Sequence, residues 1–454
     1  MPAELRTLVA LLGLIWYTAL LGLSVIGCHT ARRRYRLRPR SPLASAGPTT
    51  VPGVSILRPL KGLDTNLYEN LESTFNQEYP NYEVLMSVAD EQDQALSVVN
   101  DLVAKYPSVK ARIIIGEQVV GVNPKVNNLV RSCRFAENDI LWVLDSNVSV
   151  APGTLARSVD ALTASSAHLS TKHRRRIALV HHVPFAWSSE PTFGSQVEEA
   201  FMNTNHAKMY LAINAVALDS CVVGKSNLYR RSDLERVNGS LRPIPAGNVK
   251  QEGECGLPAF GRFLAEDNMV ASAFWHELGD RHDLSCDVAR NAVGKMSLGE
   301  YLRRRVRWIR VRKRMVMAAT LLEPFTESLL LGFIAASSIR QMFAVPIWFT
   351  MIIHYAWWLT VDLDVYASLA GHPVPSSTFW SFLCAWCTRE ILAFPIWVWA
   401  ISGDEVDWRG NTYRVLRNGE VERVPQGGSG GIRGWWALEQ RNGYDPVSQT
   451  SHLN

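Results

Sequence analysis

The pattern of apolar and polar positions divides the chain into three parts. Residues 5–27 are almost entirely apolar, and so is much of 318–401, whereas the middle, from about 51 to 314, has the mixed pattern of a soluble domain. A helix of about 20 apolar residues is long enough to cross the hydrocarbon core of a bilayer. The pattern therefore predicts a membrane protein that carries a soluble domain of roughly 250 residues.

Short apolar, β-branched runs alternate with helical patterns in the first half of this middle part. The strand-like runs are 54–60, 82–90, 111–117, 139–147 and 176–183, and the helical patterns include 66–76 and 93–105. Buried strands that alternate with helices predict an α/β domain with a mainly parallel sheet. Ligands bind at the carboxyl ends of the strands in such sheets, and Asp90 and Asp145 each follow a predicted strand.

The run 5–27 predicts an uncleaved membrane anchor. A cleaved signal peptide is the alternative, but it would need a shorter apolar core and a small-residue cleavage site. Six arginines instead follow the run, between positions 32 and 40. Because positively charged flanks stay on the cytoplasmic side, the domain that follows is expected to be cytosolic.

The C-terminal apolar region contains three candidate spans, at 318–338, 342–365 and 378–401, each interrupted by ionisable residues. Such residues normally face protein or a polar cavity. The number of spans stays open, since one of the three could be re-entrant or interfacial, and with it the side of the tail. The segment 407–420 predicts a small basic hairpin and favours the cytoplasmic side.

The expected organisation follows from these patterns. It comprises an anchor (5–27), a basic and Pro-rich linker (28–52), a catalytic domain (53–296), an amphipathic interfacial helix (297–317), a C-terminal membrane region (318–401) and a polar tail (402–454). Surface loops are expected at 165–176 and 238–261, and a flexible, Gly- and Ser-rich end at 425–454.

Charge changes this picture in one place. The net charge is only +5, yet positions 303–314 hold eight cations in twelve residues. Such a run is typical of a nucleic-acid patch, of a juxtamembrane segment or of a site that binds a diphosphate. On a helix its cations form one stripe, and the apolar residues form another face, which predicts that the helix lies along the membrane surface.

Cysteine usage adds little chemistry. The seven cysteines are an odd and scattered set, which indicates a reducing compartment. Cys384 and Cys387 form a CxxC inside an apolar segment without a second pair, so we interpret them as two small apolar residues on a helix rather than as a zinc or redox site.

Acidic residues provide the candidate chemistry. Asp90 and the LDSN segment that contains Asp145 follow strands, and Glu266 with Asp267 opens a helical pattern. Each alone is typical of a solvated turn or a helix cap. Three acidic positions followed by a basic helix are less readily explained as isolated turns and caps, and they are candidates for a functional site.

In this order the residues resemble a known family. The three aspartates and RRVRW at 304–308 resemble the D, D, D, (Q/R)xxRW pattern of membrane-bound, inverting GT-A glycosyltransferases. More narrowly, VPGVSILRPLKGLD, YPNYEVLMSVAD, GVNPKVNNL, LDSN, AEDNM and RVRWIRVR resemble the ceramide glucosyltransferases over residues 51–324. The resemblance implies a GT-A catalytic domain that transfers glucose from UDP-glucose to the primary hydroxyl of ceramide with inversion, in the Golgi or endoplasmic reticulum membrane.

The resemblance also implies a donor site. Asp90 would contact the uridine, Lys125 the nucleotide phosphates, and Arg304 and Arg307 the diphosphate. Asp145 would meet a divalent cation, Mn²⁺ or Mg²⁺, because hard cations prefer oxygen ligands. The sequence departs from the usual Asp-x-Asp here, since it reads Asp-Ser-Asn at 145–147, so we expect weaker metal binding.

On the acceptor side, the resemblance makes Asp267 the general base for the incoming hydroxyl. Glu266 competes for that role, but adjacent residues of a helix point about 100° apart, so only one is expected to reach the acceptor. Trp308 and His206 would lie near the acceptor lipid. Cys221 would lie near the nucleotide pocket without acting as a nucleophile.

Two alternative functions stay open at this point. A processive polysaccharide synthase shares the motif but needs enough spans to form a polymer channel, and an inactive relative could serve as a membrane scaffold. The expected partners are UDP-glucose, ceramide and membrane lipids, and no nucleic acid. The sequence gives neither the oligomeric state nor the preferred ceramide species.

Overall fold

The computed structural model describes residues 2–164, 175–243, 255–408, 411–416 and 419–424. Its centre is an eight-stranded sheet with the order β3-β2-β1-β4-β7-β6-β8-β5. The strands are β1 Val54–Pro59, β2 Tyr82–Val88, β3 Lys110–Ile115, β4 Ile140–Leu144, β5 Val148–Ser149, β6 Ile177–Trp187, β7 Ser226–Arg230 and β8 Arg281–Ala292. β1 to β4 are mutually parallel, as are β6 and β8. β7 is antiparallel to both β4 and β6, and β5 is antiparallel to β8. The mainly parallel sheet expected from the sequence is confirmed.

Helices cover this sheet on both faces. Ile56 of β1 shares a core with α2 (Leu67–Phe75), α3 (Ala95–Lys105) and α5 (Thr154–Thr163). Leu57, one residue on, shares the opposite core with α4 (Pro124–Phe135) and α9 (Glu266–His276). Because alternate residues of a strand face opposite sides, burial on both faces needs an uninterrupted apolar run. The expected strands β1, β2 and β4 are confirmed for this reason. The strands expected at 111–117 and 176–183 and the helices expected at 66–76 and 93–105 are also confirmed.

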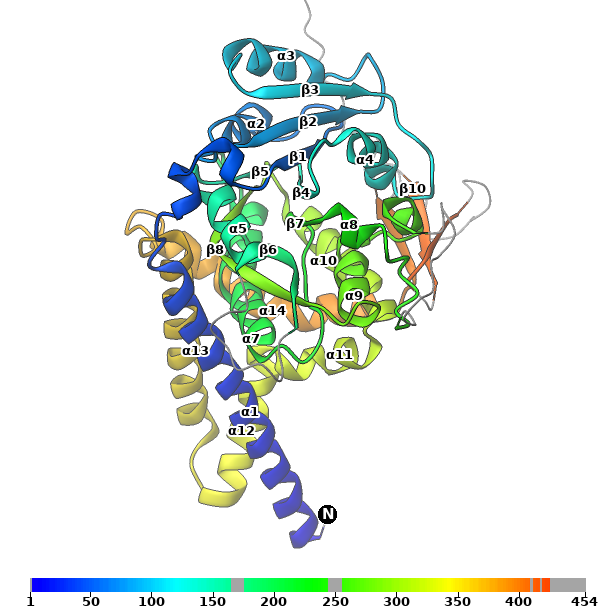
Figure 1. The fold of residues 1–454 in the computed structure, drawn as a ribbon. Helices are drawn as coiled ribbons and strands as arrows, with labels where there is room; N and C mark the ends of the chain where they lie inside the picture. Colours follow the sequence, from blue (N-terminus) through cyan, green and yellow to red (C-terminus); the bar gives the residue numbers. More distant parts are fainter. Residues whose placement is uncertain (1, 165–174, 244–254, 409–410, 417–418, 425–454) are drawn as a thin grey trace, which may run out of the picture.

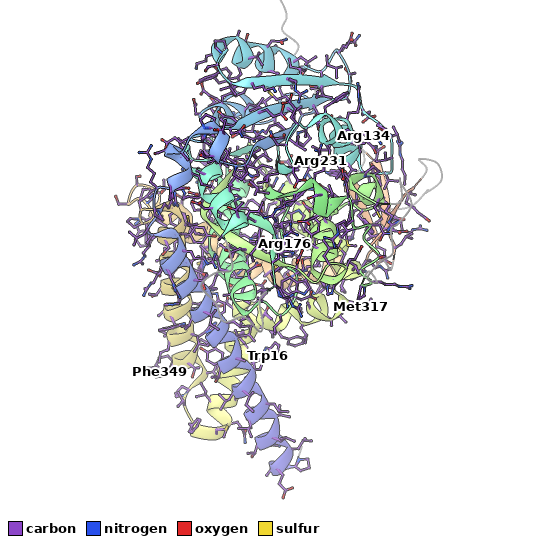
Figure 2. All side chains as sticks on the ribbon, in the orientation of Figure 1. Trp16, Arg134, Arg176, Arg231, Met317 and Phe349 are labelled. Atoms are coloured by element: carbon purple, nitrogen blue, oxygen red, sulfur yellow. The ribbon has the colours of Figure 1, made fainter. Side chains whose placement is uncertain are left out.

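Three long helices project from the domain as a bundle (Figure 1). They are α1 (Ala3–Tyr35), α12 (Ser328–Phe343) and α13 (Ile347–Ala370), and each packs against the other two. Apolar side chains such as Trp16 and Phe349 are carried by this bundle, whereas Arg134, Arg176 and Arg231 lie on the domain (Figure 2). This division is the one expected between a membrane region and a soluble domain.

Ion pairs hold the bundle together and tie it to the domain. Within the bundle, Asp364 of α13 accepts from the exposed Arg32 and Arg36 side chains at the end of α1, at 2.5 and 2.6 Å. Lys208 of α7 (Ala207–Val216) pairs with Asp362 at 2.7 Å, and both side chains are fully buried. A Cβ on Gly27 of α1 would stand 2.2 Å from the Lys208 carbonyl oxygen, so only glycine lets α1 approach α7 this closely.

The last long helix, α14 (Phe379–Ile401), lies across the base of the domain instead of in the bundle (Figure 1). It packs mainly on α6 (Phe193–Phe201) and α10 (Leu298–Met315). By length and composition, α1 and α14 of the described residues could each cross a membrane. The segments Met317–Thr326 and Ser328–Phe343, bent by 64°, could form a third span.

The expected hairpin at 407–420 belongs to a small antiparallel sheet of β9 (Glu405–Trp408), β10 (Asn411–Val415) and β11 (Val421–Arg423). This sheet is fastened to α10. Asp404 pairs with Lys313 and Arg314 at 2.5 and 2.8 Å, and Arg310 donates to the Glu405 carbonyl oxygen at 2.6 Å. Three cations of the basic run, Arg310, Lys313 and Arg314, therefore bind the C-terminal segment of the chain.

Most of the expected loops and the tail lie outside the described residues. This holds for 165–174 and 244–254 within the two loops, and for the whole of 425–454.

Candidate active site

Two of the expected acidic residues lie at the carboxyl ends of parallel strands. Asp90 comes two residues after β2, where its carboxylate accepts from the backbone N–H of Gln92 at 2.9 Å and is exposed. Asp145 comes directly after β4, and its backbone N–H donates to the Lys225 carbonyl oxygen at 3.2 Å. β1 lies between β2 and β4, so both side chains belong to the edge of the sheet where ligands of such folds bind.

Asp145 is held between two lysines. Lys125 Nζ lies 2.8 Å from one carboxylate oxygen, and Lys225 Nζ lies 3.0 Å from the other. Burial opposes ionisation of Asp145, but the charges of these two lysines outweigh it and lower its pKa to about 2. Asp145 is therefore an anion at neutral pH, and Lys225 is a member of the site that the sequence analysis missed.

Glu266 belongs to the same cluster. Its side chain is buried, with one oxygen 2.7 Å from Lys125 Nζ and the other accepting from Asn123 Nδ2 at 2.8 Å. The Asn123 side chain also caps α4 by accepting from the backbone N–H of Lys125 at 2.9 Å. Burial opposes protonation of Lys125, but Asp145 and Glu266 raise its pKa well above the ordinary value. Both oxygens of Glu266 are thus engaged in holding Lys125 and the start of α4.

Asp267, the next residue, has different surroundings. Within the described part of the chain its carboxylate forms no ion pair, and it accepts only the backbone N–H of Asn268, at 2.6 Å. A Cβ on Gly224 would stand 1.0 Å from Asp267 Oδ2, so a side chain at 224 would displace the carboxylate. Burial, and then the neighbouring Glu266 charge, raise the pKa of Asp267 to about 7. Asp267 is thus poised to exchange a proton near neutral pH.

A cavity of about 20 Å³ opens between these groups. Lys125, Gly224, Glu266 and Asp267 line one side, and residues of α4, β4, β6, β7, α9 and the turn Leu257–Arg262 line the rest. The space is comparable to that of one water molecule, so the charged groups of the donor side and the Asp267 carboxylate face a common small opening.

The arginine–tryptophan motif lies on α10, which begins with a capping box of Ser297 and Glu300. Arg304 Nε donates to Glu198 Oε1 at 2.8 Å, and its guanidinium lies 4.9 Å from the Trp308 ring centroid. Burial lowers the pKa of Lys225, and the charge of Asp145 raises it. The charge of Arg304 lowers the Lys225 pKa further. The motif therefore lies near the lysine–aspartate cluster. Arg307 is half-buried one turn along the same helix.

His206 lies beside this motif. It ends a π-helical turn, Met202–His206, between α6 and α7, and its ring centroid is 6.2 Å from that of Trp308 and 5.8 Å from that of Tyr210. Burial and the nearby Arg305 charge lower the His206 pKa to about 3, so the imidazole is neutral at pH 7. π-Helical turns are frequent at functional sites. Sequence periodicity did not indicate this one.

The structure thus brings most of the expected residues into two adjoining groups. Lys125, Asp145, Glu266 and Asp267 form one, with Lys225 added, and Arg304, Trp308 and His206 form the other. Cys221 packs against an apolar core that includes residues of α7, and burial raises its pKa to about 12. That thiol is protonated at neutral pH, consistent with the expectation that it is no nucleophile.

The oxygen atoms around Lys225 have the chemistry of cation ligands. The Lys225 ammonium lies 3.0 Å from Asp145 Oδ2 and 3.2 Å from Asn147 Oδ1, so two hard oxygens converge on one positive charge. Such a pair suits Mg²⁺ or Mn²⁺ when phosphate oxygens and water complete the shell. No group of three acidic, histidine or cysteine ligands exists among the described residues, so the protein supplies a minimal set.

Comparison with known proteins places these features in context. The model of glycosyl transferase family 21 matches residues 14–246 and 248–421. A ceramide glucosyltransferase of Komagataella phaffii is 37% identical over 91% of this chain and 91% of its own length. One of Candida albicans is 32% identical over 82% and 88%. Among solved structures, the mannosyltransferase PcManGT of Pyrobaculum calidifontis, in complex with GDP-Man and Mn²⁺, is 17% identical with a TM-score of 0.44, covering 87% of this chain and 98% of that one.

Proposed function

Because the chain belongs to glycosyl transferase family 21, we propose that it transfers glucose from UDP-glucose to the primary hydroxyl of ceramide, with inversion, to give β-glucosylceramide and UDP. The family and the GT-A type α/β domain make it a glycosyltransferase. The observation that carries the finer assignment is the Asp267 carboxylate. It is half-buried without an ion pair among the described residues, beside two lysines that suit a diphosphate.

On the donor side, the nucleotide diphosphate binds where Lys125, Lys225, Arg304 and Arg307 concentrate positive charge. Negative charge grows on the leaving phosphate oxygen as the bond to the sugar breaks, and charges already fixed in place stabilise it. Asp90, at the end of β2, accepts a hydrogen bond from the uracil N–H.

A divalent cation held by Asp145 and Asn147 with the donor phosphates would supply further positive charge to the departing diphosphate. The chain's own residues do the rest. Lys125 is kept charged by Asp145 and Glu266, and it is therefore ready to bind a phosphate oxygen.

On the acceptor side, Asp267 removes the proton from the ceramide hydroxyl while the hydroxyl oxygen attacks the anomeric carbon of glucose. The new C–O bond forms on the face opposite UDP, the electron pair of the old bond leaves with the phosphate oxygen, and the proton passes to the carboxylate. An alcohol is too weak an acid to ionise alone, so a base with a pKa near the working pH is effective. Glu266 is less suited to this role, because Lys125 and Asn123 occupy its oxygens.

The acceptor is a membrane lipid, so the arrangement in the bilayer belongs to the proposal. We place α1, α12 and α13 across the membrane and α14 in its interface at the base of the domain. Support comes from the sheet β9–β11, which is fastened to α10 and so lies on the domain's side. The arginines at the end of α1 and just after it support a cytosolic position for that side, and we assign the protein to the membrane of the Golgi or endoplasmic reticulum. A tag placed after residue 424 should be accessible from the same side as the domain.

The decisive experiment uses purified protein, UDP-glucose and a mixed ceramide extract. We expect a glucosylated ceramide, identified by mass, from the wild type and none from Asp267→Asn. Asp101→Asn, an exposed carboxylate of α3, is the matched control and should retain full activity. A high-mass polymer would support the polysaccharide synthase instead, and no turnover at all would support the scaffold.

A further inference from the structure

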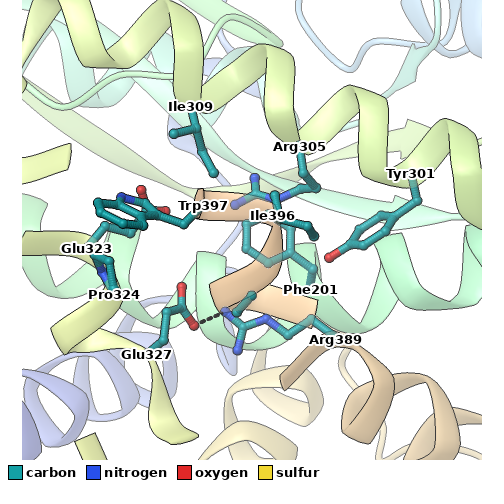
Figure 3. Close-up of a pocket in the computed structure, with 11 residues that line it drawn as sticks. Phe201, Tyr301, Arg305, Ile309, Glu323, Pro324, Glu327, Arg389, Ile396 and Trp397 are labelled. Atoms are coloured by element: carbon teal, nitrogen blue, oxygen red, sulfur yellow. Dashed lines mark hydrogen bonds and ion pairs between the residues drawn. The ribbon is translucent and has the colours of Figure 1, made fainter. Parts of the chain in front are cut away.

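A second, smaller cavity lies where α10 meets the membrane-side helices (Figure 3). Its volume is about 10 Å³, and it is enclosed by α6, α10, the turn Glu323–Thr326 and α14. Ionisable side chains line it although it lies at the base of the domain, where apolar packing would be the cheaper solution. The four that matter are Arg305, Glu323, Glu327 and Arg389.

Three of these four have ionic partners. Arg389 pairs with Glu327 at 2.5 Å, as the dashed line in Figure 3 marks, and also with Glu390. Glu323 pairs with Arg312 of α10. These pairs link α10 and α14 to the turn before α12, and they leave no carboxylate at the cavity without an arginine.

Arg305 is the exception. Its residue is only 8% exposed, and its guanidinium lies 3.6 Å from the Phe201 ring centroid (Figure 3). In the described ranges it makes no hydrogen bond or ion pair. A guanidinium carries five N–H donors, and Arg305 lines the cavity without an acceptor for them among the described residues. The unused donors point to an acceptor group that enters the cavity.

The cavity adjoins the acceptor side of the proposed site. The Arg305 guanidinium lies 5.6 Å from the Trp308 ring centroid, and the Phe201 ring is 5.4 Å from that of His206. The hydroxyl oxygen of Tyr210, whose ring stacks on His206, accepts from the backbone N–H of Val223 at 3.0 Å, and Val223 precedes Gly224, which abuts the Asp267 carboxylate. A lipid that reaches Asp267 from the membrane face would therefore pass this group.

Given the proposed function, we infer that the cavity receives the amide head of the lipid acceptor and that Arg305 donates a hydrogen bond to the amide carbonyl oxygen. The charge of the lining favours a neutral ligand. In the lining, Arg305 and Arg389 are balanced by Glu323 and Glu327, so a phosphate head group would meet two carboxylates. Arg305 is a positioning residue, because it holds the acceptor and touches no reacting atom.

Arg305→Met tests this inference, because methionine keeps the packing on Phe201 and removes the donors. Arg303→Met, an exposed arginine of the same helix, is the matched control. The acceptors are N-hexanoyl sphingosine and an analogue in which an ether replaces the amide. We expect Arg305→Met to raise KM for the amide lipid about 10- to 100-fold, the worth of one hydrogen bond to a charged group, with unchanged KM for UDP-glucose. It should barely affect KM for the ether, and Arg303→Met should affect neither.

The outcomes separate the two proposals. Equal loss with both acceptors would make Arg305 a structural residue and overturn the inference, as would an unchanged KM, which would mean that the cavity holds water only. Thermal unfolding and UDP-glucose binding of Arg305→Met show whether an equal loss with both acceptors is caused by misfolding. If Arg305→Met is misfolded, Arg305→Lys, which keeps the charge and N–H donors, is tested instead. It should retain the preference for the amide lipid if the inference holds. If the wild type transfers nothing to ceramide, the proposed function fails and this inference fails with it.

Discussion

Asp267 gives the sharpest test of the site, through the pH dependence of transfer. A general base works only when it is ionised, so the rate should fall as pH drops below its pKa, which burial and Glu266 raise to about 7. With that value, about one tenth of the carboxylate is ionised at pH 6 and about nine tenths at pH 8, so kcat/KM should rise roughly tenfold between them. An ordinary aspartate would give almost no change over this range.

The neighbours of Asp267 fix the direction of two further shifts. The Glu266 charge raises the Asp267 pKa and the Lys125 charge lowers it. Glu266→Gln should therefore move the rising limb to lower pH and flatten the profile between pH 6 and 8, whereas Lys125→Met should move it to higher pH. Bound UDP-glucose adds negative charge, so the limb of kcat should lie at higher pH than that of kcat/KM.

The assay is the initial rate of glucosylceramide formation from pH 5.5 to 8.5, at constant ionic strength and with each substrate varied. Asp101→Asn serves as the control and should reproduce the wild-type profile. A flat wild-type profile, or a shift of Glu266→Gln toward higher pH, would refute the assignment of Asp267 as the base in this electrostatic setting.

Three other predictions follow from the same contacts. Removal of divalent ions by a chelator should reduce transfer, with Mn²⁺ or Mg²⁺ restoring it, and the effect should vanish in Asp145→Asn; full activity of the metal-stripped wild type would show that the lysines and arginines alone neutralise the diphosphate. Arg307→Ala should cost about 2–4 kcal/mol of transition-state stabilisation, read from kcat/KM. Lys313→Ala should instead loosen β9, which would appear as faster proteolysis after residue 403, and should leave kcat within a few-fold of the wild type. Lys208→Met should lower the free energy of unfolding by about 3–5 kcal/mol because it leaves Asp362 buried and unpaired, and the double variant with Asp362→Leu should recover part of that loss in thermal unfolding.

The fold was readable where one physical cause dominates the local sequence. Strands β1, β2 and β4 are buried on both faces, so their short, uninterrupted apolar runs indicate buried strands directly. The arrangement of the membrane region was less accessible, because apolar composition indicates burial or lipid contact alike. The sequence of α14 is apolar enough for a membrane span, yet the helix packs on α6 and α10. Similarly, a bend of 64° separates Met317–Thr326 from α12 within one apolar stretch.

The candidate site shows a similar limit. Lys125, Asp145 and Asp267 could be named because they match a family pattern, but the contacts within their cluster join segments that are far apart in the sequence. Lys225 lies in a turn that reads like any surface turn, and nothing local marks it as the partner of Asp145. The contacts of Arg310, Lys313 and Arg314 could not be predicted either, because their partners lie about 90 residues later, at Asp404 and Glu405.

The ties between α1, α7 and α13 have a consequence for which lipids the enzyme can use. Lys208 of α7 forms a fully buried ion pair with Asp362 of α13, and Gly27 seats α1 against the Lys208 backbone, so the domain cannot rise or sink relative to the bundle without breaking these contacts. In the proposed arrangement, the Asp267 carboxylate therefore stands at a fixed height above the bilayer. We expect lipids to be sorted by how far their hydroxyl can be lifted out of the membrane, so that a second bulky group on the head should matter more than several methylenes in a tail.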